Sequence, residues 1–91
     1  MIRVTIFSRP GCHLCDEMKA LVQRAAISFP LSLNEVDISR DADLEARYGV
    51  EIPVLMIEGK KVAKVRVTEE QLTRMLDART GGSGKTGGTG R

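Results

Sequence analysis

Two cysteines, Cys12 and Cys15, stand three residues apart in the run Gly11-Cys12-His13-Leu14-Cys15. Residues three apart lie on one face of a helix, so the two sulfurs can close a disulfide with little backbone movement. A cysteine at a helix start meets unpaired backbone N–H groups and the helix dipole, which lower a thiol pKa to about 3.5–7.5. The thiolate is the nucleophile of disulfide exchange. The pair therefore predicts redox chemistry, in which Cys12 attacks and Cys15 resolves the mixed disulfide.

Three neighbours of the cysteines are candidate supporting residues. Gly11 would let a substrate backbone approach Cys12 closely, because glycine has no side chain. Arg9 would add positive charge near the thiolate, and His13 would do the same when protonated. The alternative interpretation of Arg9 and His13 is that both are solvated loop residues.

The surrounding sequence predicts the elements that must position these residues. Apolar residues alternate along residues 2–7, which predicts a strand, and an apolar stripe at helical spacing follows over residues 13–27. Later patterns predict a strand over 31–38, a short helix over 41–48, strands over 54–57 and 62–67 that form a hairpin, and a last helix opened by Thr68-Glu69-Glu70-Gln71. The order β-α-β-α-β-β-α begins with a parallel crossover. It predicts an α/β fold with a mixed four-stranded sheet flanked by helices.

The length of 91 residues suits a single small domain, which we expect over residues 1–79. Residues 80–91 contain no apolar side chain, which predicts a flexible tail rich in Gly, Ser and Thr. The tail contains Gly-Ser-Gly-Lys-Thr, but it lacks the first glycine of a phosphate-binding loop and the flanking strand and helix.

The charge distribution excludes several classes of partner. Of the 14 basic residues, Lys85 and Arg91 lie in the tail, so residues 1–79 are balanced at 12 basic and 12 acidic residues. A basic patch and clustered aromatic residues, which favour nucleic acid, are both missing from the sequence.

The apolar stretch formed by the first seven residues is too short, and alternates too regularly with polar residues, for a signal peptide or a membrane span. We therefore expect a cytoplasmic monomer that binds neither nucleic acid nor membrane.

Beyond the cysteine pair, further segments carry a resemblance to a known family. Ser8-Arg9-Pro10-Gly11-Cys12-His13-Leu14-Cys15, the Ile52-Pro53 pair before the third strand, and the closing hairpin and helix resemble the glutaredoxin-like branch of the thioredoxin-fold family over residues 2–79. The resemblance implies a thioredoxin-like fold and a thiol–disulfide oxidoreductase. It also implies a cis Ile52–Pro53 bond, packing of Pro53 beside the two sulfurs, and pairing of the Ile52 backbone with a substrate's extended chain.

Departures from the glutaredoxin pattern bear on glutathione. His-Leu separates the cysteines in place of Pro-Tyr or Pro-Phe, and Glu51 precedes Ile52-Pro53 where glutaredoxins have Thr-Val-Pro. The hairpin turn Glu58-Gly59-Lys60-Lys61 stands in place of a Gly-Gly turn followed by Asp. These differences argue against glutathione as the dedicated partner. We expect no cofactor, and as partners a disulfide-containing protein or small-thiol substrate and a separate reductant.

Two other functions remain open from the sequence. A Cys-x-x-Cys is half of a four-ligand metal or iron–sulfur site, and the one further His or Cys in the chain is His13. Cys12 and Cys15 would therefore need a second protomer or external ligands, and we expect no metal within one chain. The third function is a non-catalytic interaction module that kept the fold. Metal content and the rate of thiol titration distinguish these alternatives.

Overall fold

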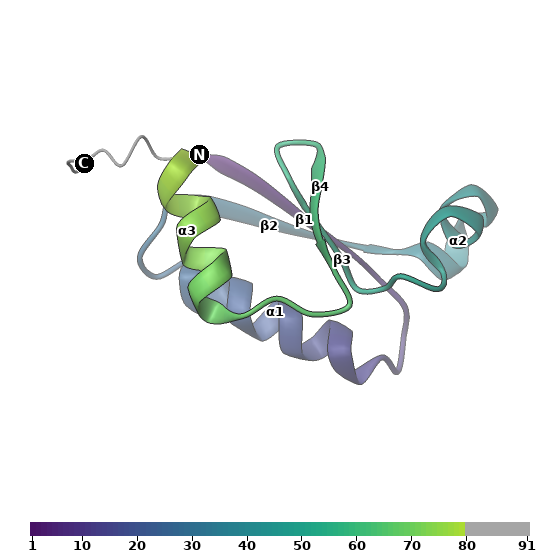
Figure 1. The fold of residues 1–91 in the computed structure, drawn as a ribbon. Coiled ribbons are helices and arrows are strands. Elements are labelled where there is room, and N and C mark those ends of the chain that lie inside the picture. Colours follow the sequence, from purple (N-terminus) through teal and green to yellow (C-terminus); the bar gives the residue numbers. More distant parts are fainter. Residues whose placement is uncertain (80–91) are drawn as a thin grey trace.

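The computed structural model describes residues 1–79, and its elements follow the predicted order (Figure 1). In chain order they are β1 (Ile2–Ser8), α1 (His13–Ala25), β2 (Leu31–Asp37), the 3-10 turn η1 (Ile38–Arg40), α2 (Ala42–Tyr48), β3 (Val54–Ile57), β4 (Lys60–Lys64) and α3 (Glu69–Arg79). The predicted tail, residues 80–91, lies outside the described residues. Within residues 1–79, none of the helices has the length and apolar character that crossing a membrane requires.

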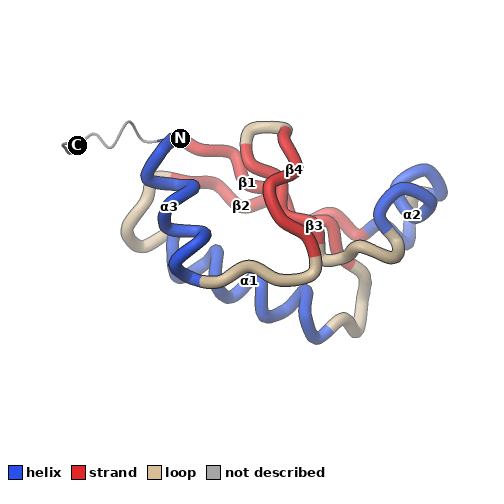
Figure 2. Tube along the Cα trace, in the orientation of Figure 1, coloured by secondary structure: helices blue, strands red, loops and turns tan. Residues whose placement is uncertain are grey.

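The four strands form one mixed sheet in the order β2-β1-β3-β4 (Figure 2). β1 is parallel to β2 and antiparallel to β3, and β4 is antiparallel to β3. The right-handed crossover rule for parallel strands explains why α1 returns across one face of this sheet. The predicted α/β class and mixed four-stranded sheet are confirmed.

The core lies between the sheet and the helices α1 and α3, which share one face of it (Figure 1). Every second residue of β1 is buried, as period-two alternation predicts. The fully aliphatic centre is built from Ile2, Val4, Ile6, Met18, Val22, Leu55, Ile57, Val67, Leu72 and Leu76. This packing fixes α1 on the sheet and with it the position of the α1 N-terminus.

Helix α2 lies beyond the end of the sheet rather than over its middle (Figure 1). Its N-cap residue is Asp41, whose carboxylate accepts hydrogen bonds from the N–H groups of Asp43 and Leu44. At its other end the ring of Tyr48 stacks on Phe7 of β1, with ring centroids 4.8 Å apart. This contact holds α2 against the end of β1 from which the cysteine loop departs.

The predicted fourth strand over residues 62–67 is wrong in its bounds, since β4 spans Lys60–Lys64. Glu58 and Gly59 both have positive φ, at 52° and 82°, which makes a tight two-residue turn and starts the strand at once. The strand ends before Val65, whose φ is 66°. The Val65 N–H still donates to the carbonyl of Pro53 at 2.7 Å, in the register of the hairpin, but the Arg66 N–H turns back to the Lys64 carbonyl at 2.7 Å and the pairing stops there.

Candidate active site around Cys12 and Cys15

Cys12 and Cys15 are joined by a disulfide, with Cα atoms 5.2 Å apart. Cys12 is the N-cap residue of α1, and its sulfur accepts a hydrogen bond from the Cys15 N–H at 3.1 Å. Cys12 is half-buried, whereas Cys15 is 2% exposed and belongs to the buried side of α1. The two sulfurs thus differ in access, because one sits at the helix start and the other one turn inside.

The loop before α1 is shaped by Gly11, whose φ is 78°. This left-handed conformation is one that glycine adopts without steric cost. Apart from its neighbours in the chain, no residue would lie within 4 Å of a Cβ on Gly11, so the rest of the molecule leaves this side of the loop open. The Cys12 N–H donates to the carbonyl of Arg9 at 3.3 Å, and the Cys12 carbonyl accepts the N–H of Asp16 at 3.2 Å.

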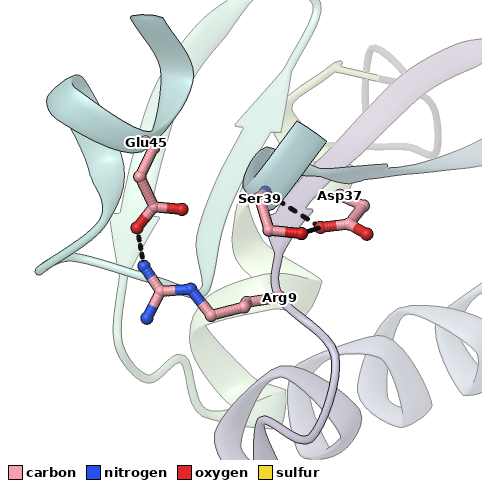
Figure 3. Close-up of polar contacts among 4 residues, drawn as sticks. All are labelled: Arg9, Asp37, Ser39 and Glu45. Carbon is pink, nitrogen blue, oxygen red and sulfur yellow. Dashed lines mark hydrogen bonds and ion pairs between the residues drawn. The ribbon is translucent and has the colours of Figure 1, made fainter. Parts of the chain in front are cut away.

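Arg9 turns its guanidinium away from α1 and forms an ion pair with Glu45 of α2 (Figure 3). Asp37, at the end of β2, accepts hydrogen bonds from the Ser39 N–H at 2.9 Å and the Ser39 hydroxyl at 2.6 Å. These two bonds hold the pKa of Asp37 below its ordinary value, and the positive charge of Arg9 contributes to the same shift. The charge of Arg9 is therefore shared among carboxylates of β2 and α2.

The Ile52–Pro53 peptide bond is cis, and Pro53 is fully buried. The next residue, Val54, pairs with Phe7 across β3 and β1, so Pro53 and the loop leading to Cys12 meet at the same end of the sheet. Ile52 is half-buried. Within residues 1–79 its backbone N–H and C=O form no hydrogen bond, so both groups are free to pair with another chain.

Glu51 lies two residues before Pro53 and is paired with two lysines of β4. Its carboxylate oxygens lie 3.0 Å from Lys61 Nζ and 3.7 Å from Lys64 Nζ. The hydrogen bond from Lys61 is the main cause that holds the pKa of Glu51 below its ordinary value, and the charge of Lys64 adds to it. The negative charge beside the proline is therefore compensated from β4.

The structure brings together the predicted residues Arg9, Gly11, Cys12 and Cys15 in one loop and helix start, while His13 is exposed to solvent. Glu45, Lys61 and Lys64 were not predicted as site residues from the sequence. Ion pairs across 36 residues, as between Arg9 and Glu45, leave no periodic pattern in a sequence. The described part of the chain contains no group of three or more His, Cys, Asp or Glu side chains placed to hold a metal ion.

Comparison with known proteins extends these observations. The glutaredoxin-like domain family (DUF836) matches residues 3–77. A glutaredoxin-like protein YDR286C homolog from Dictyostelium discoideum is 31% identical over 77 residues, which are 78% of this chain and 71% of that protein.

Two solved structures show the same architecture. Protein XcR50 from X. campestris has 32% sequence identity and a TM-score of 0.70, and the match covers 82% of this chain and 96% of that one. A mutant thioredoxin from Halobacterium salinarum has 22% identity and a TM-score of 0.61, over 85% of this chain and 73% of its own. The fold is therefore thioredoxin-like, and the chain belongs to the glutaredoxin-like domain family (DUF836).

Proposed function

We propose that this protein is a thiol–disulfide oxidoreductase that exchanges disulfides through Cys12 and Cys15. The observation that carries the proposal is the asymmetry of the pair. Cys12 stands at the N-cap of α1, where backbone N–H groups favour a thiolate, and Cys15 is 2% exposed one turn further in. An attacking sulfur needs access and a low pKa, while a resolving sulfur needs only to reach its neighbour.

The proposed cycle consists of two exchanges. The Cys12 thiolate attacks one sulfur of a substrate disulfide, the substrate S–S bond breaks, and the departing thiolate takes up a proton. Cys15, as thiolate, then attacks the Cys12 sulfur, which forms the Cys12–Cys15 disulfide and releases the second substrate thiol. The substrate gains two electrons and two protons, and the protein pair loses them. A separate thiol or dithiol reductant returns Cys12 and Cys15 to the reduced state.

In this proposal, Ile52 and Gly11 support docking of the substrate, and His13 supports the thiolate. The free backbone groups of Ile52 pair with an extended segment of the substrate, beside Pro53. Gly11 leaves the approach to Cys12 open, since no residue other than its chain neighbours lies within 4 Å of its missing Cβ position. His13, exposed between the cysteines, adds positive charge near the thiolate when it is protonated.

We further propose a protein disulfide or a small disulfide as substrate in the cytoplasm, with the protein acting as a monomer. Glutathione is not its dedicated partner, because the cations around the site already hold carboxylates of this chain. Arg9 is paired with Glu45, and Lys61 and Lys64 are paired with Glu51. A ligand carboxylate would have to compete with each of these pairs.

Two serine variants test the function. We expect Cys15→Ser to form a mixed disulfide through Cys12 that accumulates, because resolution is lost, and Cys12→Ser to form none. The reduced variants are mixed with a small aromatic disulfide, and intact mass and peptide mapping identify the adduct. Wild type should pass through the adduct and end as the internal disulfide. An adduct on Cys15 of the Cys12→Ser variant that forms as fast as the Cys12 adduct would contradict the assigned roles.

A further inference from the structure

Arg9 is anchored at both its ends, and the two anchors connect the cysteine loop to α2. Its backbone carbonyl accepts the Cys12 N–H at 3.3 Å, and its guanidinium pairs with the Glu45 carboxylate (Figure 3). Glu45 lies 36 residues further along the chain, in the helix that Tyr48 holds against Phe7 of β1. The loop that carries Cys12 is therefore tied to a second element that is itself fixed on the sheet.

Gly49 shows how closely these groups approach. A Cβ on Gly49 would lie 2.5 Å from the carbonyl oxygen of Glu45, 2.9 Å from its Oε1 and 3.3 Å from Arg9 Nη2. The backbone of Gly49 is ordinary right-handed helix, with φ −55° and ψ −32°. The glycine is thus required first by the Glu45 carbonyl oxygen, and the ion pair fills the space next to it; the backbone conformation of Gly49 alone would accept another residue.

The pairing also changes what the charge of Arg9 can do. The side chains of Arg9 and Glu45 are 40% and 41% exposed, so the pair is half-shielded from water. A cation bound to a carboxylate presents little net charge to a sulfur further away. Direct electrostatic stabilisation of the Cys12 thiolate by Arg9 is weakened accordingly, whereas the mechanical connection through the loop remains.

We propose that Arg9 and Glu45 are positioning residues, whose ion pair fixes the Arg9–Cys12 loop so that the Cys12 sulfur is held at the N-terminus of α1. This inference rests on the proposed function, since it assigns the pair a part in the exchange at Cys12. A misplaced reacting group slows a reaction even when the chemistry is intact. The pair would act on the rate at Cys12 without contacting the substrate.

The direction in which two single substitutions change the rate at Cys12 distinguishes a positioning role of Arg9 from direct electrostatic stabilisation of the thiolate. If the pair positions the loop, Arg9→Gln and Glu45→Gln both slow the reaction of reduced Cys12 with a small disulfide, here dithiobis(nitrobenzoate). We expect each rate constant to fall about two- to fivefold, the size that a half-exposed ion pair supports. If Arg9 acted by charge, Glu45→Gln would release its cation, lower the pKa of Cys12 and speed the reaction. Opposite effects of the two variants would overturn the proposal.

A double-mutant cycle and a control complete the experiment. Arg9→Gln with Glu45→Gln should be no slower than either single variant, and the reversed pair Arg9→Glu with Glu45→Arg should recover part of the rate. The matched control is Glu70→Gln, which breaks the exposed ion pair between Glu70 and Arg74 on α3 and should leave the rate unchanged. Additive losses in the double variant, or a fall in Tm without a change in rate, would overturn the proposal.

Because the assay follows only the reaction of Cys12 with a small disulfide, it tests the positioning role independently of the proposed oxidoreductase activity. The first equivalent of coloured thiol released from dithiobis(nitrobenzoate) reports the attack by Cys12 and requires neither resolution nor a protein substrate, whereas resolution by Cys15 releases the second equivalent. A wild type that reacts here but never turns over a disulfide with an added reductant would contradict the oxidoreductase. The comparison of Arg9 and Glu45 variants would still decide whether the ion pair positions the loop.

Discussion

The backbone N–H of Cys15 donates a hydrogen bond to the sulfur of Cys12 across 3.1 Å. The same N–H belongs to the first turn of α1, where the backbone donors have no partner within the helix. In the reduced protein this donor faces a thiol or a thiolate, and hydrogen bonding to the charged form favours that form. We therefore predict that reduced Cys12 is the more acidic of the two thiols, since Cys15 has no such donor at a helix start.

Selective alkylation tests this difference between the two thiols. We expect brief treatment of the reduced wild type at mildly acidic pH to label Cys12 first. Its thiolate persists below the pKa of an ordinary thiol, about 8.5, whereas Cys15 is 2% exposed. Peptide mapping locates the label, and the Cys12→Ser variant gives the rate of Cys15 alone. Preferential labelling of Cys15, or equally slow labelling of both cysteines, would contradict the proposed roles of Cys12 as attacking and Cys15 as resolving thiol.

Glutathione should bind weakly, because the cations near the site are already paired. We expect S-methyl glutathione, which cannot exchange thiols, to give no saturable complex below about 1 mM in an NMR titration. Glu51→Gln is the informative variant, since it releases Lys61 and Lys64 for a ligand carboxylate. Tight saturable binding by the wild type would restore glutathione as the partner.

Glu35 should contribute stability that depends on pH. It accepts a hydrogen bond from Lys19 at 3.0 Å, and this bond is the main cause that lowers its pKa below 4.5. A lowered folded pKa means that the stabilisation is full above the unfolded pKa and is lost as pH falls through the folded one. Both side chains are more than a third exposed, at 38% and 36%, so solvent screening keeps the effect below about 1 kcal/mol.

Urea unfolding of Glu35→Gln at several pH values measures this contribution. We expect the variant to be less stable than wild type at pH 7, with the gap closing below about pH 4 as Glu35 is protonated in the wild type. Lys19→Gln should show the same loss at pH 7. A gap that stays constant down to low pH would show that the charge of Glu35 has no part in it.

Val65 should be a strained position. Its φ of 66° is left-handed, which costs a side chain other than glycine about 1–2 kcal/mol, whereas asparagine tolerates it. Val65 is 38% exposed, so little apolar burial is lost on replacement. We expect Val65→Asn to raise the free energy of unfolding by about 0.5–1 kcal/mol. Val62→Asn, in the middle of β4, is the control and should lower the free energy of unfolding. A lower free energy of unfolding for both variants would contradict the proposed strain at Val65.

The sequence also predicts that residues 80–91 are dispensable, because they offer no apolar side chain to any surface. We expect a chain that ends at Arg79 to keep its Tm and its rate of exchange at Cys12. Thermal unfolding and the small-disulfide assay compare it with the full chain. A clear loss of either property would show that the last segment docks on the domain.

Features that depend on neighbours in sequence were predictable. The capping box at Thr68 and Gln71 forms as expected, with reciprocal hydrogen bonds of 3.0 Å, because both partners lie within one helical turn. The Cys12–Cys15 spacing fixed which face of α1 carries both sulfurs for the same reason. Alternation along β1 gave its buried face, since side chains of a strand point to opposite sides in turn.

Other features arise from contacts between distant segments. The apolar alternation of β2 breaks at Glu35, yet β2 pairs with β1 residue for residue. Glu35 keeps its place because Ser8 and Lys19 bind its carboxylate. The end of β4 at Lys64 was missed because Val65 takes a left-handed φ of 66° and the Arg66 N–H turns back to the Lys64 carbonyl, which the apolar pattern does not indicate.

The sequence by itself determined the order of the elements, the α/β class and the cysteine pair at a helix start. Each of these follows from propensities and spacings that act within a few residues. Only the tertiary structure decided that Arg9 faces Glu45 rather than the sulfur, and that Glu51 is compensated by Lys61 and Lys64. Ion-pair partners are chosen by which side chains the packed sheet and helices bring within reach, and charges on exposed side chains carry no pattern that identifies the partner in advance.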